Sequence, residues 1–189
     1  DHMIDVAACM RALLGCNAIR RAAEAAAGRS LSDDADLERL TVIAFLHDIG
    51  KANAGFQARF WKLESEIPRF WPGHCGHSAD GWVLFSDSAA SVGAPRILDG
   101  LPLALETWGE SAHALLRASI SHHGRPVDEQ GHHGASVWHP VKAGKETIYD
   151  PANAVAEMGA RIQRLYASAF LDTGPPLPGS AAFVHLFAG

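Results

Sequence analysis

The sequence predicts an all-α fold, and three features lead to that class. Apolar residues recur every three or four positions in several segments, as they do on the inner face of a helix. Capping Ser and Asp residues precede some of these segments, and Gly or Pro residues follow them. No stretch of the 189 residues alternates apolar and polar side chains for long enough to indicate a strand. A bundle of helices is therefore the expected architecture.

The N-terminal part is expected to contain two helices. Residues 3–27 predict one long helix with an apolar stripe, and Gly28 stands where that helix should end. Ser32 or Asp33 can cap the second helix, because their side-chain oxygens can accept a hydrogen bond from its first turn. This second helix runs into a His-Asp pair and is expected to stop near Gly50.

The middle of the chain predicts three shorter helices. They cover residues 55–66, 77–85 and 111–120, each with apolar side chains at helical spacing. Residues 93–102 are expected to form a loop. Residues 125–149 show little periodicity, and an irregular segment of that length is often functional.

The C-terminal part predicts two helices separated by a proline-rich break. Asp150 can cap a helix whose first residue is Pro151, since proline is tolerated at that position. This helix is expected to continue to about Leu171. Residues 180–189 begin a last, apolar helix.

Composition restricts the class of protein. Hydrophobic residues make up 48% of the chain and charged residues 20%, which is typical of one globular domain. The net charge of -5 argues against a free-standing, high-affinity DNA-binding protein, which would carry a basic surface. No apolar run approaches about 18 residues, so no membrane partner is expected. Three cysteines without zinc-ribbon spacing favour a reduced, cytoplasmic protein.

Histidine is the most informative residue type, with 11 in the chain. The central motif, His47-Asp48-Ile49-Gly50-Lys51, stands at the end of a predicted helix. Its imidazole can bind one metal ion, while its carboxylate can bridge two. The glycine is expected to open the turn, so that Lys51 can direct its charge toward a phosphate. A helix-end histidine beside a solvent-facing aspartate is the alternative interpretation.

Three further histidine positions lie at predicted helix ends. The His122-His123 pair ends one helix, while His77 and His2 stand where two others begin. Side chains from separate helices of a bundle can converge on a metal ion. Mixed imidazole and carboxylate ligands favour Mn, Fe, Co, Ni or Zn over Mg. Ordinary surface histidines are the alternative for each position taken alone.

In their order along the chain, these motifs resemble the HD superfamily of metal-dependent phosphohydrolases. In finer detail the sequence resembles the HD nuclease domain of type I CRISPR nuclease–helicases, which implies an all-α HD-domain bundle with its metal site at the helix ends. The His-Asp-x-Gly-Lys motif with a trailing Phe-Gln pair is more specific than a generic His-Asp match. The resemblance is carried by four stretches, which are His2 to Ala8, Leu46 to Gln57, Gly76 to Ala79 and Ile120 to Gly124.

The resemblance implies a role for each matched residue. It implies two divalent metal ions joined by a bridging carboxylate, with Lys51 neutralising charge on the scissile phosphate. The ligands of the first ion would be His2, His47 and Asp48, and those of the second would be Asp48, His77, His122 and His123. Asp48 and Lys51 would thus form the catalytic pair. The family also uses a late aspartate, for which Asp172 is the nearest substitute in this chain.

The activity that the resemblance implies is hydrolysis of single-stranded DNA in type I CRISPR interference, by a two-metal mechanism. Residues 1–189 would form the nuclease domain, cut from a longer protein in which a helicase domain follows. Single-stranded DNA, that helicase domain and the guide-RNA surveillance complex are the implied partners, and an inhibitor protein is a further candidate. The alternatives are a nucleotide phosphohydrolase of the same superfamily and a metal-free protein-docking module.

Some other side chains have simpler interpretations. Trp71 and Trp138 stand in predicted loops and are candidates for stacking on bases. His74 and Cys75 form a cluster with His77, but no fourth ligand stands at the usual zinc spacing, so an exposed loop is expected there. His133 is expected to be exposed to solvent.

Overall fold

The computed structural model describes residues 2–102, 105–171 and 174–188. It divides into two compact units, of which the first comprises Asp1–His47, Pro102–Pro126 and Arg161–Gly189. The second comprises Asp48–Leu101 and Val127–Ala160. Both units are built mainly from helices, and a single two-stranded sheet is found among the described residues. The predicted all-α class is confirmed.

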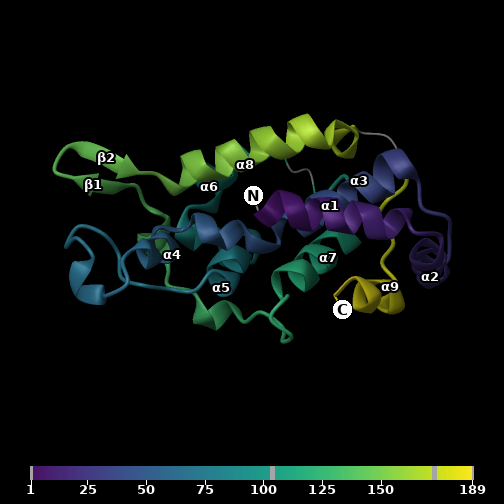
Figure 1. Ribbon diagram of the computed structural model, residues 1–189, viewed down its shortest axis with the longest axis horizontal. Helices are drawn as coiled ribbons and strands as arrows, with labels where there is room; N and C mark the ends of the chain where they lie inside the picture. The colour runs from purple at the N-terminus through teal and green to yellow at the C-terminus, as the bar shows by residue number, and fades with distance from the viewer. Residues whose placement is uncertain (1, 103–104, 172–173, 189) are drawn as a thin grey trace. The chain divides into compact units, whose positions relative to one another are not determined.

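The first unit packs its helices around one buried helix. Its helices are α1 (His2–Gly15), α2 (Asn17–Ala27), α3 (Glu38–Phe45), α7 (Ser111–Ile120) and α9 (Ala181–Ala188). In Figure 1, α1 lies along α3, and α9 lies beside α2 and α7. From Arg39 to Phe45 every side chain of α3 is buried, because α1, α7 and the 3-10 turn Ala167–Phe170 cover it. A helix that is buried on all sides is the core of its unit.

The prediction of one helix over residues 3–27 is wrong, because α1 and α2 are separate. Cys16 lies between them with an extended ψ of 121°. The two axes bend by 85°, which lets each helix turn its own apolar face toward the unit's interior. Gly28 ends α2 as predicted, in the left-handed conformation with φ of 72°. Among the described residues, no single helix is both long enough and apolar enough to cross a membrane. The bent pair of α1 and α2 has the required length and composition only when the two helices are taken together.

The predicted cap at Ser32 is confirmed, and it belongs to a buried charge cluster. The Ser32 hydroxyl accepts a hydrogen bond from the Asp36 backbone N–H, at the start of the π-helical turn Asp33–Leu37 that precedes α3. The Asp36 carboxylate is fully buried and accepts two hydrogen bonds from Arg29, at 2.7 and 2.8 Å. Burial alone would raise the pKa of Asp36, but the bonds from Arg29 and Ser32 outweigh it and lower that pKa.

We expect Asp36→Asn to lower the free energy of unfolding by about 3 kcal/mol at pH 7, because it leaves the Arg29 charge without its counterion. A carboxyl whose pKa is depressed by folding adds stability above its ordinary value of 3.8, and loses it as the pH falls toward the folded value. Urea unfolding from pH 7 to pH 3 should therefore show the two proteins converging below about pH 4. Asp34→Asn, at an exposed position of the same turn, is the matched control. A difference that stays constant with pH would contradict the assignment.

The second unit consists of short helices, 3-10 turns and a hairpin. Its helices are α4 (Ala54–Gln57), α5 (Ser78–Trp82), α6 (Ala94–Leu98) and α8 (Pro151–Leu165), of which α8 belongs to this unit as far as Ala160. Strands β1 (Val141–Ala143) and β2 (Glu146–Tyr149) pair antiparallel (Figure 1). Further 3-10 turns are Ala58–Phe60, Glu64–Glu66, Val83–Phe85, Ala89–Val92, Glu129–Gly131 and Ala135–Trp138.

Several predicted boundaries in this unit are wrong. The helix predicted over residues 55–66 ends at Phe60, after α4 and one 3-10 turn. Residues 93–102 contain α6, which has Pro95 in its first turn and buries Ile97. The segment predicted to be irregular, residues 125–149, ends in the β1–β2 hairpin, whose strands are too short for sequence alternation to reveal. Helix α8 begins at Pro151 as predicted, but it ends at Leu165 before the predicted Leu171.

Candidate metal centre

His47 is held in one orientation by the end of the buried helix α3. The chain leaves α3 in a 3-10 helix, Leu46–Ala52, which brings His47 out of the core with little exposure. Its Nδ1 donates to the carbonyl of Ala44 at 2.8 Å, since a carbonyl oxygen only accepts. In the neutral ring, Nε2 then carries the lone pair. An imidazole fixed in this way is prepared to bind a metal ion through Nε2.

The first unit gathers four imidazoles, which we call the imidazole cluster: His2, His47, His122 and His123. The Nε2 atoms of His2 and His47 lie 3.3 Å apart, and the rings of His47 and His122 have centroids 5.0 Å apart. The rings of His122 and His123 lie 4.2 Å apart. These residues come from the start of α1, the end of α3 and the turn after α7. Four of the six predicted metal ligands therefore lie together in this unit.

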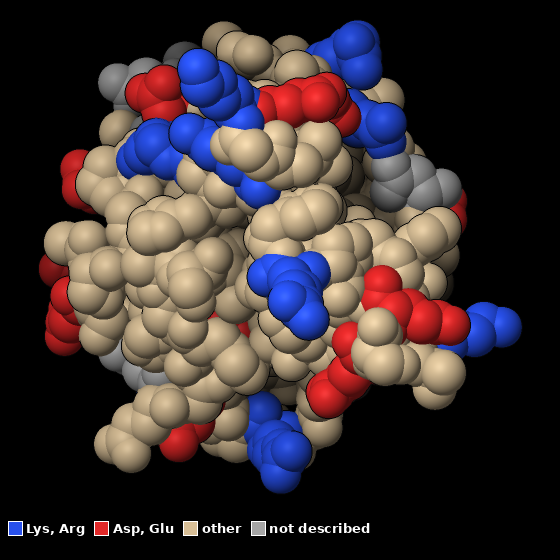
Figure 2. Space-filling view, turned by 90° about the vertical axis from the view of Figure 1, so that its left-hand side faces the viewer, with Lys and Arg blue, Asp and Glu red and all other residues tan. Residues whose placement is uncertain are grey.

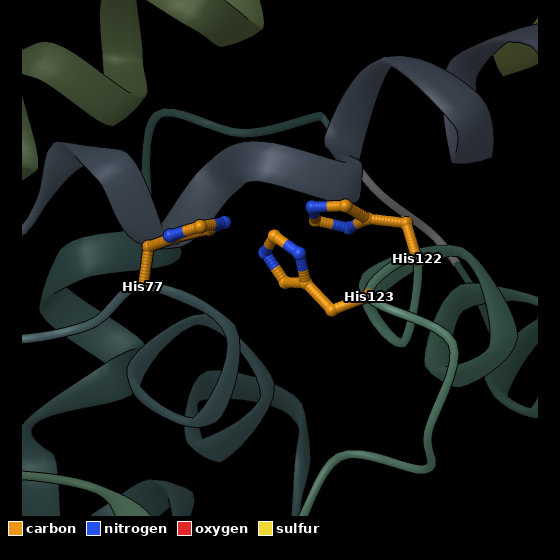
Figure 3. A group of neighbouring side chains, drawn as sticks. All are labelled: His77, His122 and His123. Atoms are coloured by element: carbon orange, nitrogen blue, oxygen red, sulfur yellow. The ribbon is translucent and has the colours of Figure 1, made fainter.

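The His122-His123 pair stands in the turn that follows α7, and Figure 3 shows both side chains projecting from it. His122 Nδ1 lies 3.3 Å from the carbonyl of Ser119, to which it donates, so its Nε2 is also left as the acceptor of the neutral ring. Gly124 follows with φ of 78°, a conformation that suits glycine, and reverses the chain. Both oriented histidines thus use the carbonyl three residues earlier.

A groove of about 590 Å³ lies beside this pair in the first unit. Ser121, Gly124 and Arg125, which flank the pair in sequence, line it together with Arg117 of α7 and His185 of α9. Its remaining lining is apolar. Cationic side chains over an apolar floor suit the phosphates and sugars of a nucleic acid strand.

The second unit holds the bridging carboxylate of the predicted site. Asp48 is only 1% exposed, and its backbone kinks the 3-10 helix with φ of -112° and ψ of 18°. The Lys51 Nζ lies 2.5 Å from Asp48 Oδ2, and His77 Nε2 lies 3.0 Å from Asp48 Oδ1. Phe56 contacts the ring of His77 at 5.2 Å between centroids. A buried carboxylate needs polar or charged partners, and here a lysine and a histidine lie at its two oxygens.

Gly50 and Gly81 allow the backbone carrying Asp48 to lie against the start of α5. A Cβ on Gly50 would overlap the carbonyl of His77 and approach the backbone N of Gly81 to 2.8 Å. A Cβ on Gly81 would lie 2.9 Å from the backbone N of Gly50. Gly50 lies within the 3-10 helix Leu46–Ala52 and does not adopt the left-handed conformation that favours glycine. Its missing side chain instead lets His77 reach Asp48.

Asp80 is a buried carboxylate that the sequence analysis did not single out. It is fully buried one turn after His77, and it accepts hydrogen bonds from the backbone N–H and Nδ1 of His133 at 2.7 and 2.9 Å. Cys75 lies close enough to make a possible ligand trio with them. Its thiol donates to Asn53 Oδ1, and burial raises its pKa to about 12. These hydrogen bonds suffice to fasten the loop after Gly131 onto α5, so the trio needs no metal ion.

Other predictions about side chains have mixed outcomes. Trp138 is fully buried, so the proposal that it stacks on bases is wrong, whereas Trp71 is half-exposed. His74 lies within 3.1 Å of the carbonyls of Ala58 and Trp61, which gives it a structural role. His133 is exposed as expected, although it is bonded to Asp80. Asp172, the substitute for the late aspartate, lies outside the described residues.

The donor atoms fit divalent transition-metal ions. The imidazole cluster of the first unit offers nitrogen, and the second unit offers the carboxylate oxygens of Asp48 with the imidazole nitrogen of His77. Nitrogen with oxygen is the donor set of Mn, Fe, Co, Ni and Zn sites, while magnesium prefers oxygen alone. His47 and Asp48, which belong to different units, are consecutive in the chain.

Comparison with known proteins gives one match. The family model described as "Cas3, HD domain" matches residues 1–189, which is the whole chain. No curated protein and no solved structure gives a significant match.

Proposed function

This chain belongs to the family of Cas3 HD domains, which are metal-dependent nucleases of CRISPR systems, and from that premise we propose that it hydrolyses single-stranded DNA with two divalent ions. The imidazole cluster is the observation that carries the proposal. Four histidines from three segments lie together, and backbone carbonyls leave Nε2 of His47 and His122 available for a metal ion. Packing does not explain such a cluster, because only His47 is buried while His2, His122 and His123 are exposed to solvent and bury little surface.

The proposed ligand sets follow the family resemblance. Asp48 would hold both ions, because only a carboxylate among these residues offers two oxygens. By the same resemblance, His2 and His47 would complete the first set, and His77, His122 and His123 would complete the second. Backbone bonds to Ala44 and Ser119 orient two of these rings, so ligand positions do not depend on side-chain rotamers alone.

The chain's own residues prepare the substrate phosphate for attack. Lys51 has its charge beside Asp48, from which it can turn to a phosphate oxygen when ions satisfy the carboxylate. In the first unit, Arg117 and Arg125 line the groove beside the His122-His123 pair, where their charges can hold phosphates of a bound strand. When bound, the metal ions lower the pKa of water and offset the negative charge that develops on the phosphate.

The proposal predicts metal-dependent cleavage. The chelator-treated protein should not cut a labelled single-stranded oligonucleotide, and Mn²⁺, Co²⁺ or Ni²⁺ should restore cutting more effectively than Mg²⁺. Metal analysis after manganese loading should give two ions per chain. Cleavage that survives EDTA would refute the proposal, because every step depends on the ions.

The same experiment separates the remaining alternatives. Turnover of deoxynucleotides without cleavage of a long strand would indicate a nucleotide phosphohydrolase. Negligible metal uptake would indicate a protein-docking module. We further propose, from the family resemblance alone, a helicase domain in the same protein, a guide-RNA complex as partner and the cytoplasm as compartment.

A further inference from the structure

A loop of the second unit exposes large apolar side chains to solvent. This loop, residues 59–71, is called the aromatic loop below. Phe60 is 85% exposed, Leu63 60% and Phe70 48%. Burying such side chains would normally stabilise the fold by about 1.5–3 kcal/mol each, so their exposure needs a reason. A cluster of exposed apolar side chains indicates a binding surface.

The rings of the aromatic loop form a connected series. Phe60 contacts Trp61 with centroids 5.6 Å apart, and Trp61 contacts Trp71 at 5.1 Å. Trp71 contacts Tyr149 of β2 at 5.7 Å, and its indole N–H donates to the carbonyl of Ala54 at 2.8 Å. The inner end of the series is thus fixed to the unit, which leaves the exposed ring of Phe60 at the outer end, supported by the partly exposed Trp61.

Basic residues stand next to these aromatic residues in the loop sequence. Arg59 lies over the ring of Phe56, with its guanidinium carbon 4.9 Å from the centroid. Among the residues that the structure describes, Lys62 and Arg69 have no ion-pair partner. The loop also contains the acidic residues Glu64 and Glu66. The Glu66 carboxylate accepts a hydrogen bond from the backbone N–H of Leu63 within the loop.

The loop is tied to the Asp48 region of the same unit. Gln57 Nε2 donates to the carbonyl of Lys51 at 2.7 Å, two residues before the loop begins. The Lys51 ammonium, itself on Asp48, lies 5.7 Å from the ring of Phe56, which also contacts Arg59. A nucleic acid strand bound to the loop would therefore contact the same compact unit that carries Asp48.

Charge alone is a poor means for this chain to hold a nucleic acid. Its net charge is -5, and Figure 2 shows a face on which Lys and Arg side chains are interspersed with Asp and Glu. Stacking on aromatic rings supplies affinity that does not depend on net charge, and it tolerates any base sequence. Open rings with cations between them are the arrangement that binds single strands.

We propose that the aromatic loop seats the unpaired bases of single-stranded DNA on Phe60 and Trp61, with Lys62 and Arg69 at the adjoining phosphates. The inference rests on the proposed function, since it names a second contact for the same substrate. Double-stranded DNA has no open base faces, so this contact also selects a single strand. A docking site for a protein is the competing use of such a surface, and it predicts no dependence on bases.

The test compares strands with and without bases. A fluorescein-labelled oligothymidylate and an abasic strand of the same length are titrated in EDTA, so that binding is measured without cleavage. The wild type should bind the oligothymidylate more tightly than the abasic strand. Phe60→Ala with Trp61→Ala should weaken oligothymidylate binding roughly five- to hundredfold and leave abasic binding nearly unchanged.

Leu165→Ala is the matched control, because Leu165 is also a large exposed side chain but lies outside the aromatic loop. It should bind both strands as the wild type does. Circular dichroism melts of all variants check that they fold. If the double variant binds oligothymidylate as tightly as the wild type, the inference is wrong and the surface serves another partner.

Failure of the inference is distinguishable from failure of the proposed function. Hydrolysis of bis(p-nitrophenyl) phosphate by the manganese-loaded wild type reports on the metal chemistry, and this small substrate has no bases or strand. If the wild type hydrolyses it and cuts single-stranded DNA, yet the double variant binds strands normally, only the aromatic loop is refuted. If the wild type does neither, the proposed function is refuted.

Discussion

Replacing Asp48 with alanine should lower the rate of single-strand cleavage by roughly 10³-fold or more and remove the high-affinity binding of manganese. Asp48 is almost fully buried, and its two oxygens are the atoms that the proposed bridge requires. Its loss also leaves Lys51 and His77 facing each other with no carboxylate between them. A gel assay of strand cleavage measures the first effect, and calorimetric titration with Mn²⁺ measures the second.

Two further variants make this experiment specific. Asp48→Asn keeps the size of the side chain and removes its charge, so it should fold and still fail to bind metal ions tightly. Asp87→Ala removes an exposed carboxylate from the same unit and should behave as the wild type does. Cleavage by Asp48→Ala at the wild-type rate would show that the nuclease site lies elsewhere.

Replacing Gly50 with alanine should destabilise the protein by about 3 kcal/mol, the upper end of the usual cost of overpacking. The added Cβ would overlap the carbonyl of His77, which is backbone and cannot rotate away. The start of α5 must then move, and His77 moves with it. We therefore expect weaker manganese binding even at temperatures where the variant is folded.

Urea unfolding measures the loss of stability, and calorimetry measures the change in metal affinity. Gly73→Ala is the control in the same unit, because a Cβ on Gly73 would meet no atom of another segment within 4 Å. It should change the free energy of unfolding by less than about 0.5 kcal/mol. If Gly50→Ala leaves both quantities unchanged, the backbones of Gly50 and His77 are not in contact.

Local signals were enough to predict several elements. Ser32 caps its turn, Gly28 ends α2, and Pro151 begins α8, because each depends on hydrogen bonds and backbone angles within a few residues. The His-Asp motif could be recognised in the same way, because its two residues are adjacent and directly follow an apolar helical segment. The resemblance to the HD nuclease family rests on such short motifs in a fixed order, and the family match over the whole chain confirms it.

Features that depend on contacts between distant segments could not be predicted from the local sequence. Whether α1 continues through Cys16 depends on where the two apolar faces find partners, and periodicity is nearly the same for one helix or two. Phe60 fits the apolar face of a predicted helix, yet it is exposed because the helix ends there. Trp138 stands in an irregular segment, yet the second unit buries it completely.

The amino-acid sequence by itself determined the helical class, a few helix ends and the residues proposed as metal ligands, because these depend on short spacings and residue types. Only the tertiary structure decided that four imidazoles share one unit, that Gly50 serves close packing against His77, and that Asp80 fastens a distant loop. The physical reason is that local hydrogen bonds fix an element, whereas burial and backbone contact depend on every segment that packs against it.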